Sequence, residues 1–194
     1  YDSREELLQD VRSLNKRLVP KGLCLLPMRY QGNRALLYLY RPRCLRRDLT
    51  NDLATEVLSG AGYQGKSCEQ CVARLMHRLR EGQEFPHEVG LFLSYPPEDV
   101  KGFIDNRAEN FKCAGLWKVY GDEKRARELF ARYKRCTDIY CALWRAGSSI
   151  EQLAVPGDDL PGTIEALADE LSARATPPAF IAAPQKTDST LPTG

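Results

Sequence analysis

A histidine and two cysteines in the middle of the chain are the side chains best suited to chemistry. An imidazole beside a thiolate can activate a sulfur nucleophile, and the same two groups can bind zinc or iron. We therefore predict a catalytic pair of His87 and Cys113, and a zinc or iron site in which Cys136 joins them. In the ordinary alternative, His87 hydrogen-bonds a strand edge and both cysteines pack as small apolar residues.

Tyr95, Lys118 and Tyr120 form a second candidate group, for binding a small ligand or cofactor. The acidic residues Glu98 and Asp99 follow Tyr95 closely and would repel a phosphate unless Lys118 compensated for them. The chain has no P-loop and no Gly-rich dinucleotide motif. A small-ligand enzyme built on this group needs a pocket of about 300 Å³ or more.

Three predicted elements must position these residues: a strand over 88–94, a helix over 97–106 and a strand over 115–120. If the strands are parallel, both begin at one edge of the sheet, which brings His87 close to Cys113. Tyr95 and Tyr120 would then lie at the opposite edge, where ligands usually bind in open α/β sheets. An antiparallel pairing would remove the first juxtaposition.

The rest of the chain predicts helices and one hairpin. Polar caps followed by apolar residues at helical spacing, and apolar runs around a turn, give this order: a helix from Ser3 to before Pro20, strands 23–28 and 35–41, helices 48–59 and 68–80, and a long helix from Asp122 to Gly147. The fold class is α/β or α+β, with a small mixed sheet of about four strands in one domain, residues 1–155. An acidic linker with a short helix (156–175) and a disordered Pro-rich tail (176–194) should follow.

Composition restricts the classes of function. The net charge of +2 does not favour nucleic acid as a partner, and no apolar run is long enough to cross a membrane. Seven cysteines without an export signal favour reduced thiols in the cytoplasm over a disulfide framework. Cys68 and Cys71 have the CxxC spacing of redox proteins, although Cys68 also continues an apolar helix face.

Three segments carry a family resemblance: EFPHEVGLFL (84–93), YPPEDVKGFI (95–104) and WKVYG (117–121). The chain resembles the bacterial domain-of-unknown-function family DUF3793, common in anaerobic Firmicutes, from about residue 36 to residue 153. The resemblance implies that His87, Cys113 and Cys136 belong to the family pattern, and that an N-terminal segment with further His and Cys residues is missing here. Family members often lie near flavodoxin-like and iron-uptake genes, which implies redox or metal chemistry, with a redox protein as partner.

Three hypotheses of function follow. The first is thiol-redox or metal-related chemistry at His87 and Cys113. The second is a non-catalytic protein-interaction module whose cysteines are structural. The third is a small-ligand enzyme with its site near Tyr95 and Tyr120.

Overall fold

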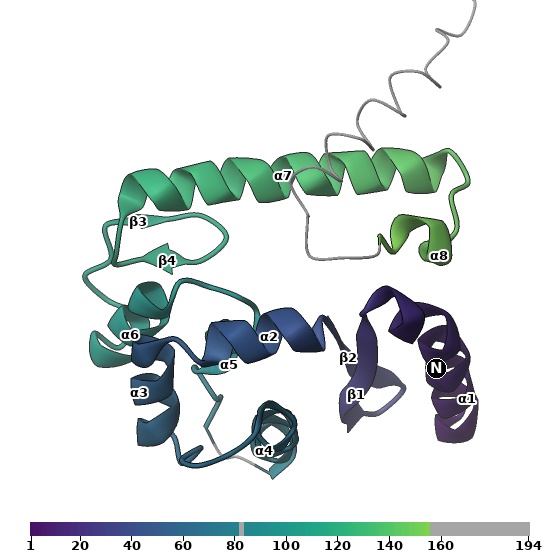
Figure 1. Cartoon of the computed structure of the whole chain (residues 1–194), viewed down its shortest axis with the longest axis horizontal. Helices are drawn as coiled ribbons and strands as arrows, with labels where there is room; N and C mark the ends of the chain where they lie inside the picture. Colours follow the sequence, from purple (N-terminus) through teal and green to yellow (C-terminus); the bar gives the residue numbers. More distant parts are fainter. Residues whose placement is uncertain (82–83, 156–194) are drawn as a thin grey trace, which may run out of the picture.

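The computed structural model describes residues 1–81 and 84–155, and these form an α+β structure (Figure 1). The described elements are α1 (Arg4–Leu18), η1 (Val19–Lys21), β1 (Cys24–Gln31), β2 (Arg34–Tyr40), α2 (Pro42–Leu49), α3 (Asp52–Gly60), α4 (Cys68–Glu81), α5 (Val89–Phe92), α6 (Pro97–Asp105), β3 (Cys113–Ala114), β4 (Lys118–Val119), α7 (Glu123–Arg145) and α8 (Ile150–Leu153). The predicted linker, short helix and tail (156–194) lie outside the described residues. No helix in the described part is both long and apolar enough to cross a membrane.

The prediction of one mixed sheet of about four strands is wrong. The described strands form two separate antiparallel pairs, β1 with β2 and β3 with β4. The predicted strand over 88–94 is instead the short helix α5. A short run of consecutive apolar residues has the same composition in a helix and in a strand, so its pattern could not separate the two.

The predicted strand over 115–120 is also wrong, because a tight turn interrupts it. The amide of Gly115 donates to the carbonyl of Trp117, and Cys113 pairs with Val119 across the hairpin. Residues 113–119 therefore fold back on themselves instead of pairing in parallel with residues 88–94. The parallel βαβ unit, and with it the argument that places His87 beside Cys113, is lost.

Helices with polar caps are confirmed. Ser67 and Gln70 bond each other reciprocally at the start of α4, and the Asp122 carboxylate accepts the Arg125 amide at the start of α7. The predicted helix over 48–59 corresponds mainly to α3, because Asn51 leaves the helical conformation and caps α3, and residues 48 and 49 instead end α2, a helix that was not predicted. The predicted β1–β2 hairpin is confirmed.

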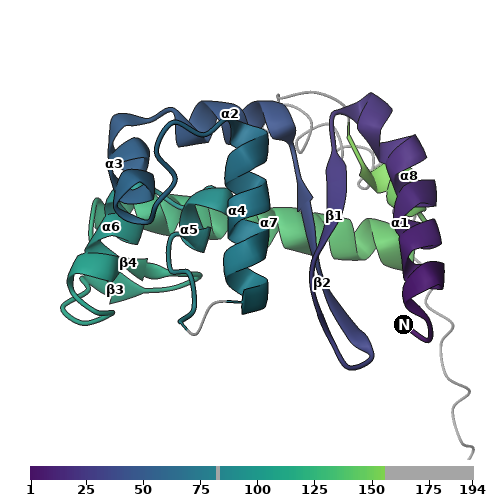
Figure 2. The same cartoon turned by 90° about the horizontal axis from the view of Figure 1, so that it is seen from below.

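The elements pack around three apolar clusters. The largest joins Met28 of β1 to Leu75 of α4 and Phe92 of α5, and a smaller one lies between α1 and β1. The third joins the β3–β4 hairpin to the first half of α7 and contains Trp117, Val119 and Ala126. Figure 1 shows α7 running along one side of the molecule from the β3–β4 hairpin to α8, and Figure 2 shows α4 between the β1–β2 hairpin and α5.

Candidate functional site

A cavity of about 440 Å³ lies between the start of α5, one face of α6 and the β3–β4 hairpin. Its walls are mainly apolar and aromatic, formed by Phe85, Val89, Tyr95, Phe103, Leu116 and Trp117. An imidazole, a carboxylate and an ammonium side chain also line it: His87, Asp99 and Lys118. Apolar walls with a few polar groups are typical of small-molecule sites of this size.

Glu88 fixes the segment that carries His87. Its side chain is buried, and one carboxylate oxygen accepts a hydrogen bond from the Tyr63 hydroxyl at 2.9 Å and an ion pair from Arg78 at 2.8 Å. The adjacent Pro86 is fully buried as well. Residues 86–88 are therefore anchored to the α3–α4 loop and to α4, and His87 is exposed beside this anchor.

Replacing Arg78 with alanine should lower the free energy of unfolding by about 2 kcal/mol, because a buried carboxylate loses its cation. Arg74 lies one turn earlier on α4 and has no ion pair within the described residues, so Arg74→Ala is the matched control. We expect a change of less than about 0.5 kcal/mol for the control. Urea denaturation of both variants measures the difference, and equal losses would contradict the role given to Glu88.

The Tyr63–Glu88 contact also predicts a response to alkaline pH. Burial, and then the charge of Glu88, raises the pKa of the Tyr63 phenol well above its ordinary value of 10.0. Above about pH 10 the unfolded chain loses this proton while the folded chain keeps it, so stability from this group is present below that pH and decreases above it. The free energy of unfolding should be measured from pH 9 to 11 in the wild-type chain and in Tyr63→Phe. Its decrease with pH should be shallower in the variant, by up to about 1.4 kcal/mol per pH unit. Parallel slopes would contradict this account.

Asp99 holds the β3–β4 hairpin against α6. Its carboxylate is buried and accepts three hydrogen bonds of 2.7 Å, from the indole N–H of Trp117 and from the amides of Tyr120 and Gly121. No Lys or Arg in the described residues pairs with it, so these three N–H donors compensate the buried charge. The network fixes the position of the indole in the cavity wall.

Aromatic contacts complete this wall. The Trp117 ring stacks on Tyr95, with ring centroids 4.6 Å apart, and meets Phe130 of α7 edge-on at 4.5 Å. Gly90 allows the close approach of α5 to α6, because a Cβ there would lie 2.8 Å from Val100. The indole is therefore supported from α6, from α7 and from the segment between α5 and α6.

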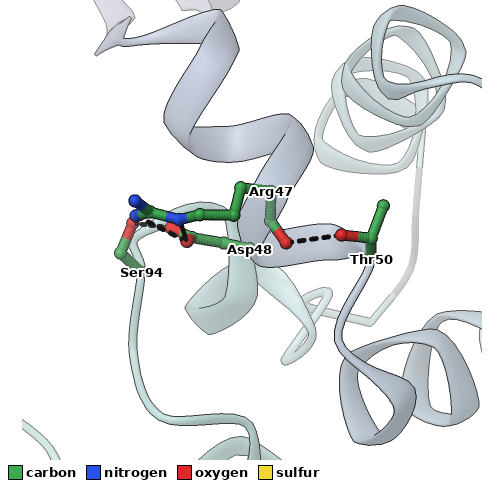
Figure 3. A network of polar contacts seen from close by, with 4 residues as sticks. All are labelled: Arg47, Asp48, Thr50 and Ser94. Carbon is green, nitrogen blue, oxygen red and sulfur yellow. Dashed lines mark hydrogen bonds and ion pairs between the residues drawn. The ribbon is translucent and has the colours of Figure 1, made fainter. Parts of the chain in front are cut away.

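A polar network fixes the residue before Tyr95. Ser94 has a left-handed backbone with φ of 58°, and its hydroxyl donates to Asp48 at the end of α2 at 2.9 Å (Figure 3). The same carboxylate accepts the Arg47 guanidinium, and the Thr50 hydroxyl donates to the Arg47 carbonyl. This network compensates for the strained conformation of Ser94 and sets the direction in which the chain enters Tyr95.

His87 lies at the rim of the cavity. Its ring centroid is 5.1 Å from that of Phe103 and 5.8 Å from that of Phe85, and its imidazole has no hydrogen-bond partner within residues 1–81 and 84–155. His87 and Phe85 also line a second depression, which carries charged residues of α4 and α6. The imidazole is thus open to a bound molecule.

Lys118 reaches the segment before the hairpin, whereas the Tyr120 side chain packs against Gly102 of α6. The Lys118 ammonium donates to the carbonyl of Ala108 at 2.8 Å and lies 4.7 Å from the centre of the Phe111 ring. The Tyr120 hydroxyl is buried without a hydrogen-bond partner in the described part of the chain. Lys118 lines the cavity, whereas Tyr120 does not belong to its lining.

The cysteines lie elsewhere. Cys113 is half-buried and packs on the Trp117 cluster without lining the cavity. Cys136 is half-buried on α7, ten residues beyond the Ala126 that packs in the same cluster, a rise of about 15 Å. Within residues 1–81 and 84–155, no three His, Cys, Asp or Glu side chains form a group that could hold a metal ion.

The thiol and metal hypothesis therefore rests on the sequence alone and stays a prediction. It expects zinc or iron in anaerobically purified protein, with the metal lost in His87→Ala and in Cys113→Ser. Elemental analysis together with thiol-reactivity measurements tests it. Metal-free protein with ordinary thiol reactivity in all three forms would contradict it.

The CxxC pair at the start of α4 has the environment of packed thiols. Burial raises the pKa of both Cys68 and Cys71 above the ordinary value. Because the thiolate is the reactive form, this environment makes both sulfurs less reactive near neutral pH. The arrangement favours the packing interpretation over the redox one.

Sequence reasoning did not single out Asp99, Trp117 and Phe103 as site residues. Asp99 was interpreted as an acid that would repel a phosphate, yet its carboxylate accepts hydrogen bonds from the hairpin. A tryptophan directly after the turn at Gly115 was the available signal for the aromatic wall. Its contacts with Asp99 and Phe130 depend on tertiary packing that no local pattern encodes.

Fold and cavity together define a small α+β protein with an aromatic-walled pocket on one side. The chain belongs to the family described as protein of unknown function (DUF3793), whose model matches residues 2–154. This confirms the resemblance found in the sequence and extends it over the N-terminal helix. No curated protein and no solved structure matches the chain.

Proposed function

We propose that the protein binds a small, flat and largely apolar molecule in the cavity between α6 and the β3–β4 hairpin. The observation that supports this most is the wall of aromatic rings, with Trp117 and Tyr95 stacked on one side and Phe103 on another, around a volume of about 440 Å³. Fixed aromatic rings bind planar apolar molecules well because they lose little conformational freedom on binding.

His87 is the polar group that would meet such a ligand at the rim. Its imidazole stands against Phe103 and Phe85 and has no competing partner in the described residues. Histidine is the side chain used most often to transfer protons. The site would therefore suit a ligand that presents a polar group to the imidazole, and any reaction would involve a proton exchanged there.

Calorimetric titration with naphthamide, a flat neutral probe, tests the proposal on the full chain. We expect saturable one-to-one binding that weakens roughly fivefold in His87→Ala, because the imidazole forms part of the wall. His77, the other histidine in the sequence, is exposed on α4 and pairs with Glu81, so His77→Ala is the matched control. Absence of binding, or equal weakening in both variants, would contradict the proposal.

The protein-interaction hypothesis also stays a prediction. Phe85 and Leu116 line the cavity and are 61% and 56% exposed, so an apolar partner could contact them at the rim. The concave volume of about 440 Å³ that they border favours a small molecule over a flat protein surface.

A further inference from the structure

Lys118 carries a charge that the described residues do not balance. Lys118 is half-buried and lines the cavity, and its ammonium contacts the Ala108 carbonyl and the Phe111 ring, two residues beside the lining, but forms no ion pair with any carboxylate described. Lys101 and Lys134 pair with Asp105 and Asp138, whereas Lys112 also lacks an ion pair with any described residue but is exposed to solvent, unlike the half-buried Lys118. A partly desolvated ammonium without a carboxylate gains much from an anion placed beside it.

The other charged group in the wall is already compensated. Both oxygens of Asp99 are occupied by N–H donors: Oδ2 by the indole of Trp117, and Oδ1 by the amides of Tyr120 and Gly121. The charge of Asp99 is therefore compensated within the fold, and Asp99 does not pair with Lys118. Among the described residues that line the cavity, Lys118 is the only Lys or Arg.

We infer that the ligand is a flat apolar carboxylic acid, bound as its anion, with its ring against Trp117 and its carboxylate at the Lys118 ammonium. This inference rests on the proposed function, because it names the chemical class of the molecule in the same cavity. A single ammonium matches a single negative charge. A doubly charged phosphate ester would face one ammonium and the carboxylate of Asp99.

Two probes of matched shape test the charge. Naphthoate carries a carboxylate where naphthamide carries a neutral carboxamide. Calorimetry measures the affinity of the full chain for each probe. We expect naphthoate to bind about tenfold more tightly than naphthamide at low salt. In Lys118→Met, which keeps the apolar stem, the two probes should bind equally, whereas Lys118→Arg should keep the preference for naphthoate.

Lys112 gives the matched control. It lies in the same hairpin region, is exposed, and donates to the Gly121 carbonyl without lining the cavity, so Lys112→Met should keep the tenfold preference. Equal affinity of the wild-type chain for both probes would overturn this inference and leave the proposed function standing. Binding of neither probe would overturn both. Loss of the preference in Lys112→Met as well would assign it to general surface charge and overturn the inference.

Discussion

Replacing Asp99 with alanine should lower the free energy of unfolding by about 4 kcal/mol or more. Three hydrogen bonds to a buried carboxylate are lost together, and the indole N–H of Trp117 is left without a partner. Natural domains are stable by only about 5–15 kcal/mol, so this loss is a large share of the total. Urea denaturation followed by circular dichroism measures it.

Two further variants separate the hydrogen bonds from the general effect of removing an acid. Asp99→Asn keeps one acceptor oxygen but places an N–H₂ group against a donor, so we expect an intermediate loss of about 2 kcal/mol. Asp105 lies on the same helix and forms an exposed pair with Lys101, so Asp105→Ala should cost less than about 1 kcal/mol. Similar losses in Asp99→Ala and Asp105→Ala would contradict the network.

Filling the cavity from its rim should abolish ligand binding without unfolding the protein. Ala114 lines the cavity and is exposed, so a tryptophan there can occupy the ligand volume without displacing a buried neighbour. We expect the affinity of Ala114→Trp for naphthoate to fall at least about a hundredfold, because the ring of the probe and the new indole compete for one space. Calorimetry measures the loss.

A tryptophan placed away from the cavity is the control for Ala114→Trp. Ala73 is exposed on α4 and belongs to no wall of the cavity, so Ala73→Trp should bind naphthoate as the wild-type chain does. Both variants should keep their melting temperatures within a few degrees. Unchanged binding in Ala114→Trp would show that the probe occupies another place.

Helix caps and turns were predicted correctly from short stretches of sequence. The Ser67 and Gln70 cap, the Asp122 cap and the turn between β1 and β2 each act within a few residues, and the structure has all three. The run over 88–94 was misinterpreted because its apolar residues 89–93 are consecutive and show no helical period, and the contact of the preceding Glu88 with Tyr63 joins it to the loop between α3 and α4. A contact between residues this far apart in the chain leaves no sign in the hydrophobic periodicity of the sequence.

The site was predicted in its parts but not in its arrangement. His87 was expected at one edge of a sheet and Tyr95 at the other, yet both line one cavity together with Lys118. The antiparallel turn of the β3–β4 hairpin, held by Asp99, brings Lys118 to this side. Cys113, expected beside His87, instead packs under α7.

The indole N–H signal of Trp117 in nitrogen-15 NMR tests the central claim most directly. The chain has two tryptophans, Trp117 in the cavity wall and Trp144 exposed on α7, and Trp144→Phe assigns their two signals. On titration with naphthoate, the Trp117 signal should shift saturably while that of Trp144 stays in place. An unchanged Trp117 signal at saturating probe, or equal shifts of both, would contradict the assignment of this cavity as a ligand site.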